Sequence, residues 1–468
     1  MKFKYIIFGM AIFFMTLSSC KKQLDLLDPQ GLEPATALSG DVNIKKVLQG
    51  GYDALSSGNL YGGNIQILAD LLASDGEMNW VGTFNNYREI WGKNIITTNS
   101  LVTGMWTSGY NVINIANSVI DSVGGVVAAD RGRVEGEALF LRATMHFELV
   151  RFFAKQYDAS AGTNPGVPVL TKPTYALPEV TRPARNSVAE VYAAVIADLI
   201  KAEGLLPASN GVFATKAAAA AVLSRVYLQK ADYAGARDAA NRGIASANST
   251  AGGKILLPNF MSNFNQAANT AEDLFAMQVS DQDGTNNMQT YYSVDIFGGR
   301  DGDIEINTKH LNLYEAGDLR KASTTNPTAA NQFAFNTAFY TKYSASRTTK
   351  WRDLYKNVKV IRLAELYLTR AEANFRLGTS VGDAPLTDLN RIHSTARTGL
   401  LPYAAITNVS QIYLERRREL AFEGFGIHDA RRFGRLIDGQ SPNSNEFIFP
   451  IPFREINANP SLTQNPGY

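Results

Sequence analysis

The chain has 468 residues, with 45 lysines and arginines, 43 aspartates and glutamates and one cysteine. A formal net charge of +2 excludes the strongly basic surface that nucleic-acid binding requires. A single cysteine excludes an internal disulfide and a cysteine-based metal site, so stability must come from core burial.

The first predicted element is an export signal. Lys2 and Lys4 precede an apolar run at 5–15 that is too short for a permanent transmembrane helix. The L-S-S-C run that ends at Cys20 resembles the lipobox of bacterial lipoproteins, in which the cysteine carries the lipid. We therefore expect 1–19 to be a lipoprotein signal peptide and 20–39 a lipidated tether. An ordinary cleaved signal with a chance cysteine is the alternative.

Helical periodicity dominates from residue 40 onward. It predicts helices near 41–57, 101–123, 131–156, 187–204, 215–230, 233–247, 359–377 and 408–423. The long irregular segments between them, 58–100, 157–186 and 248–358, are typical of functional loops and short strands. Because no Pro/Ser-rich linker divides the chain, we expect 40–468 to form a single domain.

Two stretches indicate stacked helix pairs. In the predicted helix 359–377 the polar side chains fall in one narrow wedge, so neighbouring helices should cover the rest of its surface. A second stretch has the spacing of a tetratricopeptide repeat, with small residues where a partner helix would approach. The residues at that spacing are Ala220, Leu223, Ser224, Tyr227, Ala236 and Ala240. On these residues alone an ordinary helical hairpin remains the alternative.

Three stretches together resemble the SusD/RagB family of outer-membrane nutrient-binding lipoproteins. They are 359–378, 415–434 and the terminal 449–468, which ends in Q-N-P-G-Y. The lipobox supports the same family, as do further stretches at 106–121, 135–153 and 215–236. The resemblance covers nearly the whole mature chain in the expected order.

The resemblance implies a mainly α-helical, SusD-like fold. Tetratricopeptide-like hairpins would form the scaffold, with large irregular loop insertions and a few short strands. The implied partner is a SusC-like TonB-dependent outer-membrane barrel, which places the protein on the outer membrane facing the cell exterior. The implied activity is binding without catalysis, of an oligosaccharide or polysaccharide or, as the alternative, a peptide. No cofactor and no metal are implied.

Aromatic and planar polar residues concentrate in two irregular segments, 79–93 and 286–300. Sugar recognition needs flat apolar faces for the C–H side of the ring and polar groups for the hydroxyls, and these segments offer both. The candidate ligand-binding residues are Trp80, Phe84, Asn85, Asn86, Tyr87, Arg88, Trp91, Tyr291, Tyr292 and Arg300.

Other motifs leave alternatives open. Asp70, Asp75 and Glu77 could supply the carboxylate pair of a glycoside hydrolase. The runs 281–287 and 300–305 resemble pieces of calcium loops but lack the full spacing. A scaffold that binds only protein is a further hypothesis.

The E-R-R-R-E-L run has two pairs of opposite charges spaced three residues apart, which can pair along a helix. These pairs are Glu415 with Arg418 and Arg416 with Glu419. The pattern favours a solvated or structural face over an arginine cluster for an anionic ligand. The four histidines lack metal-site spacing, and we interpret them as structural.

Overall fold

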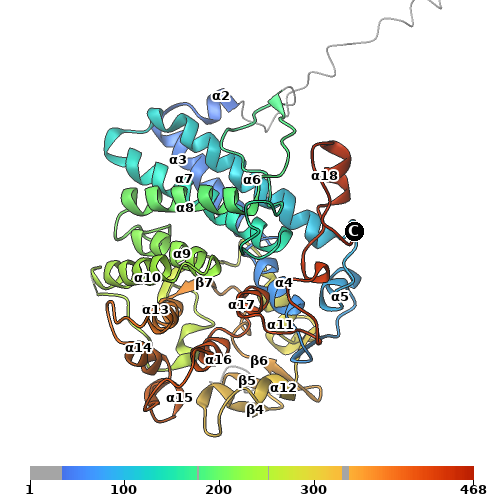
Figure 1. Cartoon of the computed structure of the whole chain (residues 1–468), viewed down its shortest axis with the longest axis vertical. Coiled ribbons are helices and arrows are strands. Elements are labelled where there is room, and N and C mark those ends of the chain that lie inside the picture. Colours follow the sequence, from blue (N-terminus) through green and yellow to red (C-terminus); the bar gives the residue numbers. More distant parts are fainter. Residues whose placement is uncertain (1–33, 177–178, 251, 329–336) are drawn as a thin grey trace, which may run out of the picture.

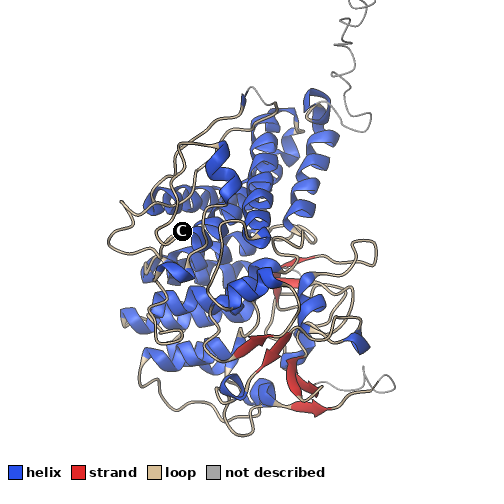
Figure 2. Ribbon diagram, turned by 90° about the vertical axis from the view of Figure 1, so that its right-hand side faces the viewer, coloured by secondary structure: helices blue, strands red, loops and turns tan. Residues whose placement is uncertain are grey.

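The computed structural model describes residues 34–176, 179–250, 252–328 and 337–468. Cys20, the signal peptide and most of the tether lie outside the described residues. Helices stack along the long axis of the molecule, and the short strands gather on one side of the stack (Figures 1 and 2). This arrangement confirms the expected helical scaffold with a few short strands. Within the described ranges, no helix is both long and apolar enough to cross a membrane.

The scaffold is a series of long helices, each packed on the next. In order these are α3 (Gly40–Leu55), α6 (Ser100–Ser122), α7 (Ala128–Phe153), α8 (Val188–Leu205), α9 (Lys216–Gln229), α10 (Tyr233–Asn248) and α13 (Leu363–Leu377). Two further helices, α14 (Pro385–Ile392) and α16 (Val409–Glu419), extend the stack beyond α13 (Figure 1).

The remaining helices are short. They are α2 (Pro34–Ala37), α4 (Asn64–Leu72), α5 (Asn85–Trp91), α11 (Asn287–Tyr292), α12 (Thr308–Leu311), α15 (Thr395–Thr398), α17 (Gly426–Phe433) and α18 (Phe453–Ala458). The 3-10 turns are η2 (Val123–Gly125), η4 (Phe260–Asn263), η5 (Asp295–Phe297), η6 (Leu319–Lys321) and η7 (Asn445–Phe447).

The α9–α10 hairpin shows how the repeat spacing produces close packing. The alanines at 217–221 are all buried, so a neighbouring helix can approach α9 closely. Asp232 caps α10 by accepting a hydrogen bond from the N–H of Gly235 at 2.9 Å. At Gly243 of α10, an added Cβ would lie 3.5 Å from Cβ of Ala220 in α9 and only 2.9 Å from Cδ1 of Leu366 in α13. The hairpin therefore packs tightly onto α13 as well.

The predicted helix 359–377 was wrong at its start. Val358–Arg362 forms strand β7, which pairs antiparallel with β2 (Asp273–Met277), and α13 begins at Leu363. Every residue of both strands is buried, so the alternation that marks a half-buried strand is absent. Helix α4 lies in a segment that we interpreted as irregular. It too is buried all round, its polar residues Gln66 and Asp70 included, and has no exposed face.

The strands form two small sheets. The larger has the order β1 (Met78–Trp80), β3 (Ile304–Ile306), β6 (Ala345–Thr348), β5 (Phe339–Lys342) and β4 (Ser323–Thr325). The smaller pairs β2 with β7. The larger sheet joins the segment after α4 to the segments after α11 and α12, which positions the candidate ligand-binding residues.

The polar wedge of α13 is buried along most of its length, and only Arg376 at its end is exposed. Glu365 and Glu372 are at most 1% exposed. Glu365 pairs with Arg225 of α9 at 2.7 Å, and Glu372 pairs with Arg432 of α17 at 2.7 Å. Because an unpaired buried charge is costly, these pairs restrict which helices can lie beside α13.

The charges of the E-R-R-R-E-L run also lie inside the protein. Glu415 and Arg418 approach to 3.5 Å, as their spacing predicts. The predicted pairing of Arg416 with Glu419 was wrong: among the described residues, Arg416 pairs with Asp429 of α17 at 2.8 Å. The run is therefore structural, and it connects helices instead of facing solvent.

The terminal Q-N-P-G-Y run fastens the chain end to the scaffold. The side-chain amide of Asn465 donates to the carbonyls of Phe153 at 2.8 Å and Phe449 at 2.7 Å. The Tyr468 hydroxyl donates to the carbonyl of Ile448 at 2.7 Å. This motif thus has a packing role at the end of α7.

Candidate functional site

The larger sheet brings the two candidate segments together. Trp80 of β1 faces Ile304 of β3 in the ladder, and the Val81 N–H donates to the carbonyl of Asp303 at 2.8 Å. Helix α5 follows β1, and α11 lies shortly before β3 in the chain. The segments 79–91 and 286–300 therefore lie side by side although they are distant in sequence.

Four rings from these segments form one cluster. Trp80 stacks on Tyr87 with ring centroids 4.6 Å apart, and Tyr87 lies 4.7 Å from Tyr291. Tyr291 also contacts Trp80 at 5.6 Å and Phe84 at 6.2 Å, both edge-on. These are the offset and edge arrangements that aromatic rings prefer. We call Trp80, Phe84, Tyr87 and Tyr291 the ring cluster.

The ring cluster has a buried inner part and an accessible outer part. Trp80 and Tyr87 are only 3% and 2% exposed, whereas Phe84 is 40% exposed and Tyr291 is half-buried. The Tyr87 hydroxyl donates to Oδ1 of Asn64 at 2.7 Å, and burial, together with the nearby Tyr291, raises its pKa. Trp80 and Tyr87 thus support the cluster from below, and Phe84 and Tyr291 present ring surface to solvent.

Arg300 lies over the outer part of the cluster. Its guanidinium carbon is 4.4 Å from the centroid of Phe84. Its Nε donates to Oδ2 of Asp303 at 2.9 Å, and its Nη2 donates to the hydroxyl of Thr83 at 3.1 Å. Burial raises the pKa of Asp303, although Arg300 opposes this. The guanidinium is held over the ring face, a position in which arginine is favoured over lysine.

The remaining candidates differ in their surroundings. Asn85 is exposed, and Asn86 donates to the Ser100 hydroxyl at 3.1 Å. Arg88 is exposed and donates to the carbonyl of Gly82 at 2.8 Å. The indole N–H of Trp91 donates to the carbonyl of Met78 at 2.9 Å, which fixes α5 to β1.

Tyr292 points away from the ring cluster. It is fully buried, and its ring lies 5.9 Å from Phe422 in the core. Asp303 and Thr83, in contrast, were not among the candidates, although both hold Arg300 in place. The i,i+3 spacing of Arg300 and Asp303 is the sequence signal that could have identified the aspartate.

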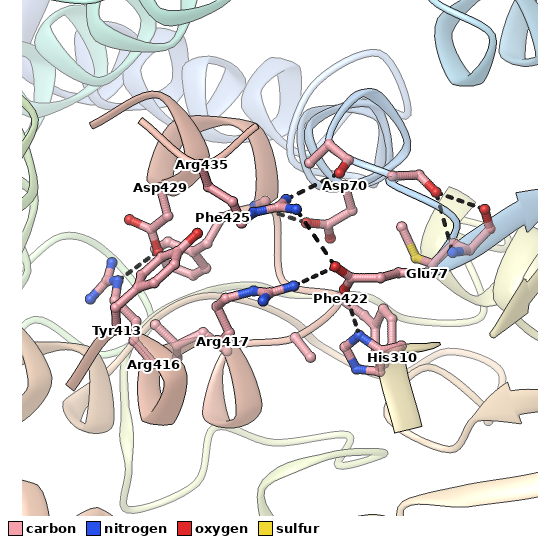
Figure 3. Close-up of a pocket in the computed structure, with 16 residues that line it drawn as sticks. Asp70, Glu77, His310, Tyr413, Arg416, Arg417, Phe422, Phe425, Asp429 and Arg435 are labelled. Carbon is pink, nitrogen blue, oxygen red and sulfur yellow. Dashed lines mark hydrogen bonds and ion pairs between the residues drawn. The ribbon is translucent and has the colours of Figure 1, made fainter. Parts of the chain in front are cut away.

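A small cavity lies at the start of β1, between α4, α16 and α17 (Figure 3). Its volume is about 60 Å³, far below the roughly 300 Å³ at which ligand pockets begin. Glu77 lies between His310 and Arg417 and binds both. Burial would raise the pKa of Glu77, but the His310 hydrogen bond and the Arg417 charge outweigh it and lower the pKa to about 2.

Asp70 lines the same cavity and connects α4 to the start of α17. Its two carboxylate oxygens accept hydrogen bonds from the N–H groups of Gly424 at 3.0 Å and Gly426 at 3.1 Å. Burial raises the pKa of Asp70 to about 7 despite these hydrogen bonds. The cavity therefore belongs to the charged interior of the scaffold, and sugar-sized molecules do not fit in it.

The three carboxylates considered for hydrolysis are all engaged in the fold. Asp70 and Glu77 hold the contacts just described, and Asp75 pairs with Lys309 at 2.8 Å. The calcium-like runs are engaged as well: Asp303 holds Arg300, and Asp283 accepts from the Ser280 N–H at 2.8 Å. Over the described part of the chain, no group of three or more His, Cys, Asp or Glu side chains is placed to hold a metal ion.

Family models match most of the chain. Residues 24–228 match a model described as starch-binding associating with outer membrane, and residues 262–447 match the model of the SusD family. Among curated relatives, the chain is 26% identical to SusD-like protein P2 of Formosa agariphila, with 98% of both chains covered. It is 34% identical to the starch-binding protein SusD of Bacteroides thetaiotaomicron over 24% of this chain and 22% of that one.

Solved structures have the same fold. A SusD superfamily protein from Bacteroides thetaiotaomicron superposes with a TM-score of 0.78 at 26% identity, covering 91% of this chain and 99% of that one. A SusD-like carbohydrate binding protein from Bacteroides vulgatus superposes with a TM-score of 0.74 at 23% identity, covering 91% and 97%.

Proposed function

This chain belongs to the SusD/RagB family, and on that premise we propose that it is a lipid-anchored binding protein of the outer membrane. It captures an oligosaccharide or polysaccharide at the cell surface and delivers it to a SusC-like TonB-dependent barrel. The observation that carries the ligand class is the outer part of the ring cluster, where Phe84 and Tyr291 lie beside the fixed guanidinium of Arg300.

The chemistry of these groups suits a sugar. An accessible ring offers a flat apolar face to the C–H side of a pyranose, and the planar amide and guanidinium groups of Asn85, Arg88 and Arg300 can hydrogen-bond its hydroxyls. Nη1 of Arg300 makes no hydrogen bond to another described residue, so it is available to a ligand. We propose binding without hydrolysis, because Asp70, Asp75 and Glu77 are committed to structural contacts.

Binding can be tested with the mature chain. Native affinity gels and calorimetry with starch, xylan, laminarin and inulin should show retardation by at least one of them. Phe84→Ala should weaken that binding, whereas Leu401→Ala, a change at an apolar side chain 83% exposed in another loop, should leave it unchanged. Equal binding by wild type and Phe84→Ala would remove the ring cluster from the ligand site.

The same samples separate the other candidate activities. Chromatography of the incubated glycans should detect no shortened products, and their appearance would establish a hydrolase instead. If the protein bound a peptide library and none of the glycans, its ligand would be a peptide, as in the peptide-binding members of the family.

The proposed lipid anchor and the proposed partner barrel have to be tested in cells. We expect Cys20→Ala to release the protein from the outer membrane, and membrane retention of this variant would contradict lipidation at Cys20. Pull-down of the tagged wild-type protein from detergent extracts should recover a TonB-dependent barrel. Recovery of the protein alone would argue against that partner.

A further inference from the structure

Two adjoining hollows lie away from the ring cluster and share one aromatic side chain. Each has a volume of about 240 Å³, and Val212 and Phe213, in the loop between α8 and α9, line both. No residue of the ring cluster lines either hollow. Phe213 is half-buried and forms the partition between them.

The first hollow lies between α3 and β2. One face of α3 supplies Gln49, Tyr52, Asp53 and Ser56, which are spaced to lie on the same side of the helix. The ring of Phe213 lies 4.9 Å from the ring of Tyr52, which holds it in place at the edge of the hollow. Gln49 and Asp53 line the hollow and are exposed, so their amide and carboxylate groups are accessible to solvent there.

The second hollow lies on the α10 side of Phe213 and is lined mainly by polar groups. Asn210, Lys254, Asn269 and Asp273 contribute to it. Through Oδ2, Asp273 pairs with the buried Lys359 at 2.5 Å and accepts from the Thr270 N–H at 2.6 Å, while its buried Oδ1 has no hydrogen-bond partner among the described residues.

One hydrogen bond connects the two hollows. Gln278 lines the first, and its side-chain amide donates to Oδ1 of Asn269, which lines the second, at 2.9 Å. Asn357 donates to the same Oδ1 at 3.0 Å, so the side-chain oxygen of Asn269 is fully used and its amide N–H groups are left for a ligand. The walls of the two hollows are therefore joined by hydrogen bonds, and both hollows adjoin at Val212 and Phe213.

We propose that these hollows form a second carbohydrate subsite, which takes neutral sugar residues on the two sides of Phe213. Amides, carboxylates and an ammonium supply both donors and acceptors, which is what ligands rich in hydroxyl groups require. Asp53 and Asp283 line the first hollow and no lysine or arginine does, so an anionic ligand such as a sulfated or phosphorylated glycan is disfavoured there.

This inference rests on the proposed function, because the ligand is the same glycan. A polysaccharide long enough to occupy the ring cluster and the second subsite together would bind more tightly than at either alone, since the second contact is intramolecular. A short oligosaccharide would not gain in this way. The second subsite would thus favour polymers over their fragments.

Hydrogen–deuterium exchange of the mature chain, with and without starch, xylan, laminarin or inulin, tests the inference. The bound polysaccharide should protect amides in 208–214 as well as in 79–91. In the variant Phe84→Ala/Tyr291→Ala, protection in 208–214 should persist while protection in 79–91 disappears. Loss of protection in both segments of that variant would overturn an independent subsite.

The failures of the two proposals are distinguishable. Protection in 79–91 alone would overturn the second subsite and leave the proposed function standing. Protection in neither segment with any of the four polysaccharides would overturn both.

Variants give a second test. Phe213→Ala should weaken polysaccharide retention about fivefold and leave short-oligosaccharide binding unchanged. Gln49→Ala is a second variant of the subsite, at an exposed helix position where the substitution does not disturb the core. Leu401→Ala is the control. Wild-type polysaccharide retention by both Phe213→Ala and Gln49→Ala would also overturn the proposal.

Discussion

The Phe84→Ala variant tests the accessible part of the ring cluster most directly. Phe84 packs edge-on against Tyr291 and lies under the guanidinium of Arg300 at 4.4 Å. An edge contact is worth about 0.5–1.5 kcal/mol and an exposed cation–π contact about 0.5–1 kcal/mol, so the free energy of unfolding should fall by about 1–2 kcal/mol. The ligand loses a stacking face and a fixed arginine, so its Kd should rise about five- to thirtyfold.

Calorimetry with the best-binding glycan gives the Kd, and urea unfolding gives the stability of the same samples. Arg300→Lys is the matched partner variant, because it keeps the charge but loses the flat surface over Phe84. If the ring and the guanidinium act together, the double variant should cost less affinity than the sum of the single variants. A Kd for Phe84→Ala within about twofold of wild type, with folding intact, would refute this reasoning.

Three further predictions concern the scaffold. Glu77→Gln should lower the free energy of unfolding at pH 7 by about 3 kcal/mol, because the fold lowers the pKa of this carboxyl from 4.5 to about 2. That stabilisation is present above pH 4.5 and is lost as the pH falls towards 2. The urea midpoint of the variant should therefore vary less than that of wild type between pH 4.5 and 2. Asn465→Ala leaves the carbonyl of Phe449 unpaired, while that of Phe153 keeps its bond from Arg185, and should lower the free energy of unfolding by about 1–3 kcal/mol; limited proteolysis should detect release of the chain end, and an unchanged cleavage rate would contradict the fastening role. Gly243→Ala places a methyl 2.9 Å from Cδ1 of Leu366, an overlap that should cost about 1–3 kcal/mol, of which the helix propensity of alanine offsets about 1 kcal/mol. A variant more stable than wild type in thermal or urea unfolding would show that Leu366 moves aside.

The helix stack could be predicted because its long helices retain a visible period. The boundaries of α6 and α10 were within one residue at each end, since both have distinct buried and exposed faces. Helix α4 and strand β7 could not be predicted in the same way. Both are buried on all sides, and their polar residues, such as Asp70 and Lys359, are buried too, so polarity in the sequence does not mark a solvent-facing side. Only the pairing of β7 with β2 decides the conformation of β7.

The candidate site was predictable as a set of residues but not as a surface. Aromatic content identified the two segments, and their meeting depends on the ladder between β1 and β3. Which rings face water is set by that ladder and by contacts such as the hydrogen bond from Tyr87 to Asn64, neither of which is local in sequence. The placement of Tyr292 in the core follows from the same limit, because adjacent residues at the end of a helix point in different directions.

Stability and ligand contact depend on different groups in this protein. Buried ion pairs such as Glu365 with Arg225 fix the order of the helices, and the inner rings Trp80 and Tyr87 attach the candidate segments to that scaffold. Asn85 projects from the same segment into solvent, so substitutions there change the surface offered to a ligand at small cost in folding. A scaffold of this kind can therefore acquire different ligands by changes at a few outer positions while its charged interior stays constant.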